Sequence, residues 1–170
     1  MFSKHRRPSE LIVRAGFATE QAVYGMLLVA GMIVAASAHG GTSAEVLVTV
    51  VVTVLVFWAA HVYAGTVAHH GLEEGHNVGL GEAFRMSLHA TWGMLLSAIV
   101  PCVILLLGTL RVFPDRLAGW LALISCIVTL AVLGYVAYQR RGAPLHLRII
   151  GALVTAGFGG LLALLKAIIH

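Results

Sequence analysis

The sequence predicts an all-α membrane protein, a polytopic bundle of five transmembrane helices. Of its 170 residues, 59% are hydrophobic and only 11% are charged, whereas a soluble domain carries about 25% charged residues because its surface faces water. The charges are also segregated, because five stretches contain no Asp, Glu, Lys or Arg: 21–38, 46–66, 86–110, 117–138 and 149–165. Stretches of about 17–25 apolar residues are what a hydrocarbon layer roughly 30 Å thick requires of a helix. The composition excludes a soluble enzyme and a nucleic-acid partner, and makes the lipid bilayer the expected surroundings.

Two regions are expected along the chain, an N-terminal segment (1–20) and a transmembrane domain (21–170). Residues 9–20 mix apolar and charged positions and predict an interfacial helix that leads into the first span. The basic N-terminus followed by Ala36-Ser37-Ala38 also resembles a signal peptide. The long lead-in before the apolar run favours a permanent first span. The expected spans are 21–38, 44–67, 86–110, 117–139 and 148–168.

The distribution of basic residues predicts the orientation, because short cytoplasmic loops are enriched in Lys and Arg. With the N-terminus in the cytoplasm and the C-terminus outside, the cytoplasmic side receives eight basic residues: Lys4, Arg6, Arg7, Arg14, Arg85, Arg140, Arg141 and Arg148. The outer side receives Arg111, Arg116 and Lys166. We therefore expect a multi-pass protein of the bacterial inner (cytoplasmic) membrane.

A row of small residues along the fifth span predicts close helix packing. Its members recur every three or four positions and so share one face of a helix: Ala152, Ala156, Gly159, Ala163 and Ala167. Small residues let helix backbones approach each other within lipid. This row predicts a tight bundle, or a homo-oligomer if it faces a second copy.

The histidines are the most unusual feature of the composition, since nine of them outnumber the seven acidic residues. His61 in the second span and His89 in the third fall at matching depth on adjacent antiparallel helices. One face of the second span also carries polar groups: Glu45, Thr49, Thr53 and Tyr63. An ionisable residue within a membrane is by default a candidate functional group, so a polar seam between these spans would move protons or a small cation. The alternative is two structural histidines, with threonines that bond to their own helix at i−4.

The loop that follows the second span predicts a possible metal site. It contains imidazole and carboxylate groups, which suit zinc, nickel or iron: His69, His70, Glu73, Glu74 and His76. Its glycines favour the alternative, a flexible and solvated polar loop. Haem is a further alternative cofactor, with His61 and His89 as two axial ligands.

No motif of an enzyme active site is present, such as a nucleophile elbow or a phosphate-binding loop.

Three stretches carry a family resemblance: Phe57–Ala64, Trp92 with Pro101 and Leu105–Gly108, and Leu161–Lys166 with His170. On these stretches the chain resembles a group of uncharacterised small integral membrane proteins of actinobacteria. The resemblance implies five spans and an inner-membrane location, and no activity. The function predicted is proton or cation movement. The alternatives are a non-catalytic accessory or scaffolding subunit of a larger membrane complex, and a haem-binding membrane protein.

Overall fold

The computed structural model describes residues 8–38, 40–73 and 76–169, and the side chains of residues 20–38, 40–70 and 78–168. Within these residues the chain forms five α-helices and one short β-hairpin: α1 Pro8–Ser37, α2 Ser43–His69, β1 Gly71–Glu73, β2 His76–Val78, α3 Leu80–Thr109, α4 Asp115–Arg140 and α5 Leu145–Ile169. Each of these five helices contains a stretch long and apolar enough to cross a membrane. The predicted all-α fold with five membrane helices is confirmed.

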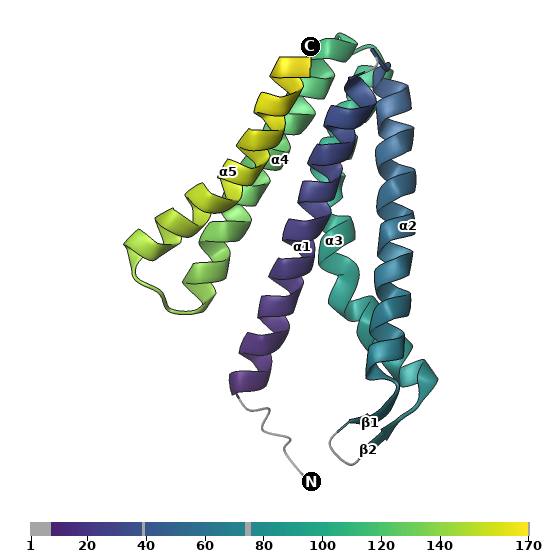
Figure 1. The fold of residues 1–170 in the computed structure, drawn as a ribbon, viewed down its shortest axis with the longest axis vertical. Coiled ribbons are helices and arrows are strands. Elements are labelled where there is room, and N and C mark those ends of the chain that lie inside the picture. Colours follow the sequence, from purple (N-terminus) through teal and green to yellow (C-terminus); the bar gives the residue numbers. More distant parts are fainter. Residues whose placement is uncertain (1–7, 39, 74–75, 170) are drawn as a thin grey trace.

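The helices form two groups that share one end (Figure 1). α1, α2 and α3 run together, while α4 and α5 form an antiparallel pair that diverges from α1 toward its far tip. We call the end with the start of α1, the β-hairpin and the α4–α5 turn the hairpin end. The end where α1, α3 and α5 finish is the C-terminal end, and there the two groups meet.

The helix expected over 9–20 is continuous with the first span, and its interfacial position stays a prediction. α1 is one continuous helix of 30 residues, Pro8–Ser37, and its membrane-length stretch begins at Glu20. The chain has a proline at the first helical position and none within the helix, so nothing interrupts the hydrogen-bonded ladder where the composition changes. At about 1.5 Å per residue, such a helix is longer than the hydrocarbon layer is thick.

The helices α2 and α3 extend further into the connection between them than the spans expected from the sequence. α2 ends at His69 and α3 begins at Leu80. Between them β1 and β2 pair antiparallel, with Glu73 opposite His76. Of the glycines in this segment, Gly71 begins β1 and Gly79 precedes α3.

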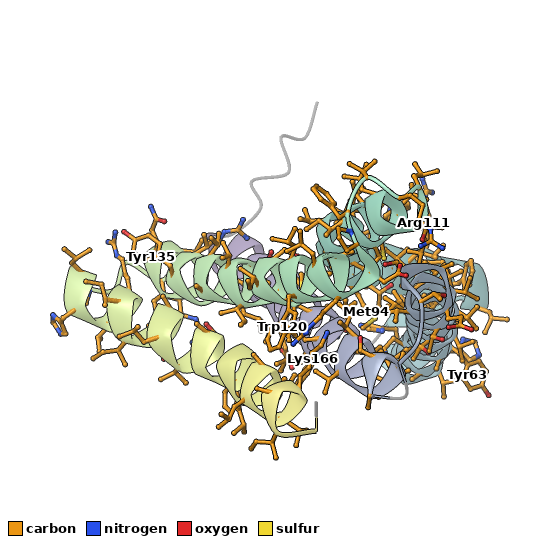
Figure 2. All side chains as sticks on the ribbon, turned by 90° about the horizontal axis from the view of Figure 1, so that it is seen from above. Tyr63, Met94, Arg111, Trp120, Tyr135 and Lys166 are labelled. Atoms are coloured by element: carbon orange, nitrogen blue, oxygen red, sulfur yellow. The ribbon has the colours of Figure 1, made fainter. Side chains whose placement is uncertain are left out.

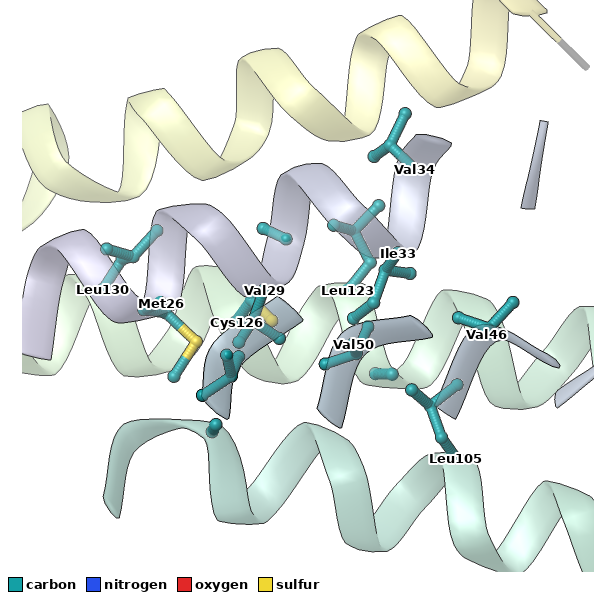
Figure 3. Close-up of a cluster of buried hydrophobic side chains, with 14 residues drawn as sticks. Met26, Val29, Ile33, Val34, Val46, Val50, Leu105, Leu123, Cys126 and Leu130 are labelled. Atoms are coloured by element: carbon teal, nitrogen blue, oxygen red, sulfur yellow. The ribbon is translucent and has the colours of Figure 1, made fainter. Parts of the chain in front are cut away.

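α1 is the central helix of the core (Figure 3). The core draws fully buried side chains from four helices: Met26, Val29, Ala30 and Ile33 of α1, Val50 of α2, Leu105 of α3, and Leu123, Cys126 and Leu130 of α4. In lipid, burial of this kind stabilises through close packing, because the tails of the lipid are as apolar as the side chains. α5 contributes only Leu162 and Ala163 to the rim of this cluster.

α4 and α5 pack through glycine and threonine. A β-carbon on Gly134 of α4 would overlap Thr155 Oγ1 and the backbone of Gly151 on α5. The Thr155 hydroxyl also donates a hydrogen bond across the helix pair to the Leu130 carbonyl, 2.8 Å away. The two backbones therefore approach closely in the hairpin-end half of the pair.

The face that α5 turns to α4 is offset from the predicted row of small residues. The buried residues of this helix among those described are Gly151, Gly159 and Lys166. Of the predicted row, Gly159 shares this face, whereas Ala152, Ala156 and Ala163 are half-buried and Ala167 is exposed. Glycine permits a shorter distance between helix axes than alanine does, so the glycines set the contact.

Candidate functional site

The two histidines expected to meet within the membrane do not face each other. Ser87 of α3 lies against Gly65 of α2, since a β-carbon on Gly65 would lie 2.8 Å from Ser87 Oγ. His89 is two positions further along α3, about 200° round the helix from Ser87, and its side chain is exposed. His61 is half-buried and its Nδ1 lies 3.0 Å from the Phe57 carbonyl oxygen one turn earlier. No hydrogen bond joins the two imidazoles within the described residues, and the proton-relay and haem hypotheses stay predictions.

Two of the four side chains on the polar face predicted for α2 are exposed. Glu45 is exposed and Tyr63 is 72% exposed, and Figure 2 shows Tyr63 at the periphery of the bundle. Thr49 and Thr53 are half-buried, and the Thr49 hydroxyl donates to the Glu45 carbonyl at 2.8 Å. α2 instead buries a row of valines: Val46, Val50, Val54 and Val62. Valines fill the interface because only apolar groups pack there without unsatisfied hydrogen bonds.

Glu45 has a local structural role at the start of α2. The Thr42 backbone N–H donates to Glu45 Oε2 at 2.8 Å, and the Glu45 backbone N–H donates to Thr42 Oγ1 at 3.3 Å. This reciprocal pair is a capping box, which satisfies two backbone donors that the first turn of a helix leaves free.

Removal of this cap is expected to lower stability by a small, measurable amount. Thr42→Ala should lower the free energy of unfolding by about 1 kcal/mol, because a donor of the first turn loses its acceptor. Thr53→Ala is the matched control, since the Thr53 hydroxyl has no hydrogen bond within the described residues. Titration of both variants with a denaturing detergent measures the difference. Equal losses for both would contradict a capping role.

The predicted metal loop remains a prediction. Glu74 and the side chains of Glu73 and His76 lie outside the described residues. His69 and His70 each direct Nδ1 to a backbone carbonyl oxygen, that of Gly65 at 2.6 Å and that of Val78 at 3.2 Å. Because α2 ends at His69, no helical turn pairs His69 with Glu73. Within the described part of the chain, no group of three or more His, Cys, Asp or Glu side chains could hold a metal ion.

The strongest candidate site is a buried lysine at the C-terminal end. Lys166 of α5 is only 4% exposed, although a lysine side chain ordinarily ends in a charged ammonium group. Its Nζ donates a hydrogen bond to Ser37 Oγ on α1 at 3.3 Å. It also lies 5.2 Å from the ring centroid of Trp120 on α4, and Figure 2 shows these two side chains beside each other. The charge therefore sits where α1, α4 and α5 meet.

Three features of this junction suit a cation. The indole ring attracts a cation held over its face. Ser37 is the last residue of α1, where the helix dipole presents its negative end. Gly119 leaves room for the ammonium group, since a β-carbon there would lie 3.0 Å from Nζ. We name Lys166, Ser37, Gly119 and Trp120 the lysine junction.

No carboxylate neutralises Lys166 within the described residues. The acidic side chains near this end have other partners. Asp115 accepts a hydrogen bond from the Ser43 backbone N–H at 2.9 Å and lies 4.0 Å from Arg111, while Glu45 belongs to the capping box. An ammonium group has three N–H donors, and the described structure supplies one hydroxyl acceptor and one aromatic face. Such a group is expensive to bury in a membrane protein and is a candidate for function.

The distribution of charges along the sequence predicts Lys166 on the outer side and does not predict its burial. Two signals would have pointed to it. Residues 116–170 contain no Asp or Glu, so Asp115, the first residue of α4, is the single acidic partner that the α4–α5 pair could offer a lysine there. Lys166 also follows Gly159 by seven positions, which places both on one face of a helix. A search against protein-family models, curated proteins and solved structures finds no match to this chain.

Proposed function

We propose that this protein is a non-catalytic accessory subunit of a larger membrane assembly. The observation that carries the proposal is the pairing of polar groups within the bundle. The buried hydroxyls of Thr66, Ser87 and Thr91 all donate to carbonyls of their own helix, at 2.7–2.9 Å. Hydroxyls paired in this way are satisfied within their own helix, which argues against their lining a route for an ion.

α5 supports the same proposal, because it offers small residues that the chain itself does not use. A β-carbon added at Gly157 or Gly160 would meet no atom within 4 Å. The neighbouring Ala156 is half-buried. Gly160 follows Ala156 by four positions, which is the spacing at which a second membrane helix packs closely. A helix of a partner protein is the occupant that this proposal assigns to the surface.

Purification from native membranes in a mild detergent tests the proposal. We expect the wild-type protein to purify with another membrane protein at fixed stoichiometry. Gly160→Leu should remove that partner without changing thermal stability, because the added side chain enters open space. Val128→Leu, at an exposed position of α4, is the matched control and should retain the partner. A wild-type protein that purifies alone, as a monomer or only with copies of itself, would contradict the proposal.

Proton or small-cation movement is the second candidate function, and one observation favours it. Gln21 Oε1 on α1 and Trp58 Nε1 on α2 are buried without a hydrogen-bond partner. Trp58 lies one turn from the half-buried His61, and all three residues belong to the halves of their helices nearer the hairpin end. Water molecules in this region would donate to Gln21 Oε1 and accept from Trp58 Nε1, two polar atoms that are costly to leave without a hydrogen bond. His61 is then the side chain that would pass the proton along the path.

Proton flux into liposomes decides between the two functions. For an accessory subunit, we expect purified protein to give the same flux as empty liposomes. His61→Ala and His89→Ala should then leave the flux unchanged. Flux above that of empty liposomes, lost in His61→Ala but kept in the lipid-facing His89→Ala, would establish the second function and overturn the first.

A further inference from the structure

The α4–α5 turn carries a concentrated positive charge. Arg140, Arg141 and Arg148 lie within nine residues, and Arg140 and Arg141 are exposed. No acidic residue occurs from residue 116 to residue 170, and the one acidic residue of the α4–α5 pair, Asp115, lies at the other end of α4. The turn also lies apart from the start of α1 and from the β-hairpin (Figure 1). The three guanidinium groups therefore form a cationic patch at the tip of the helix pair.

The backbone of this turn is fixed by its own hydrogen bonds. Gly142 adopts a positive φ of 69°, which ends α4 in a left-handed residue. The Gly142 N–H donates to the Gln139 carbonyl at 3.0 Å, and the Ala143 N–H donates to the Tyr138 carbonyl at 3.1 Å. These two bonds form a Schellman motif, and Pro144 follows it. The turn presents its arginines from a rigid base.

Arg148 is also held in place. Its Nε donates to the Ala143 carbonyl at 2.7 Å, across the turn. This bond uses one of the five N–H donors of the guanidinium group and leaves the two terminal nitrogens available. A planar guanidinium binds a phosphate through two parallel hydrogen bonds, and a group that is already oriented loses less entropy on binding.

The apolar surface next to the turn suits a lipid acyl chain. The side chains of α5 that follow the turn are large and exposed: Leu145, Ile149, Ile150, Leu153 and Val154. A ligand that contacts both the arginines and this apolar surface has a phosphate at one end and a hydrocarbon tail at the other. A free phosphate ion would use the arginines alone.

We propose that the α4–α5 turn binds the phosphate of an anionic phospholipid through Arg140, Arg141 and Arg148, with an acyl chain along the first half of α5. A basic cluster beside a membrane helix attracts anionic headgroups. This site does not depend on the accessory or transport role of the protein. The bound lipid holds the α4–α5 turn at the surface of the leaflet, at the end where α4 and α5 have diverged from α1.

The full-length protein, purified in a neutral detergent and titrated with single lipids under native mass spectrometry, provides the test. Phosphatidylglycerol should bind more tightly than zwitterionic phosphatidylcholine. The triple variant R140Q/R141Q/R148Q should weaken binding of phosphatidylglycerol roughly a hundredfold, since each basic residue near the headgroups contributes about a factor of ten or less. R111Q/R116Q, which removes two arginines from the opposite end, is the matched control and should bind as wild type does.

Three results would overturn the proposal. They are equal affinity of the wild-type protein for the two lipids, an unchanged affinity in the triple variant, and an equal loss in the control variant. Inorganic phosphate should not displace the lipid at matched concentration, and displacement would identify a free-phosphate site instead. If the triple variant does not fold, R140Q/R141Q replaces it, because neither side chain has a hydrogen bond within the described residues. That pair should weaken lipid binding by more than tenfold.

Discussion

Lys166→Glu is expected to lower the free energy of unfolding by about 3–5 kcal/mol, the usual effect of an uncompensated buried charge. The carboxylate would replace an ammonium group at a position that is 4% exposed. It would face the negative surface of the Trp120 indole and the negative end of the α1 dipole. Both features stabilise a cation, so reversal of the charge turns each of them into a repulsion. Unfolding in a denaturing detergent measures the loss.

Lys166→Met separates the charge from the packing. Methionine retains most of the apolar stem, and it removes both the hydrogen bond to Ser37 and the cost of burying an ammonium group. We expect its stability to lie within about 1 kcal/mol of wild type, because these two effects oppose each other. Arg116→Glu reverses an exposed charge at the same end and should change little. A Lys166→Glu variant as stable as Arg116→Glu would mean that water reaches the lysine junction.

Gly134→Ala is the second substitution expected to have a large effect. A β-carbon at this position would overlap Thr155 Oγ1 and the carbonyl oxygen of Gly151. Because one of the overlapping atoms belongs to the Gly151 backbone, a change of side-chain rotamer cannot relieve the clash and the two helices must move apart. That movement breaks the hydrogen bond from Thr155 to the Leu130 carbonyl. Overpacking of this kind costs about 1–3 kcal/mol, and the lost hydrogen bond adds roughly 1 kcal/mol.

Gly157→Ala is the matched control for this substitution. Gly157 lies within α5 as Gly134 lies within α4, yet a β-carbon there meets no atom within 4 Å. We expect Gly157→Ala to be neutral or slightly stabilising, because alanine favours a helix more than glycine does. If both variants lose the same stability in detergent titration, the close approach of α4 and α5 at Gly134 is not what holds the pair together.

The five membrane helices could be predicted from the sequence because a lipid bilayer restricts which segments can cross it. A segment that crosses lipid must be apolar for about 20 residues and must satisfy its backbone internally. Both conditions concern one segment of the chain at a time, so they can be tested without knowing which helices pack against it. The charge-free stretch 86–110, for example, lies almost wholly within α3, Leu80–Thr109.

The faces of the helices could not be predicted in the same way. In water, a polar row marks the outside of a helix, but a helix within lipid has apolar surroundings on every side. The polar row of Glu45 and Tyr63 on α2 was therefore assigned to an interface, whereas the structure buries valines such as Val50 there. The same ambiguity placed His89 opposite His61, although the position of Ser87 against Gly65 turns His89 outward.

Composition along the chain is enough to predict the number of membrane helices, their approximate limits and the concentration of basic residues at one end. Each of these follows from local composition measured against the thickness of a bilayer. Tertiary structure alone decided which glycines bring α4 and α5 together and which side chains α2 buries. It also decided that Lys166 meets Ser37 and Trp120. These contacts join residues up to 129 positions apart. They also depend on the rotation of each helix about its own axis. A uniformly apolar segment does not specify that rotation, so it is fixed only when the neighbouring helices pack against it.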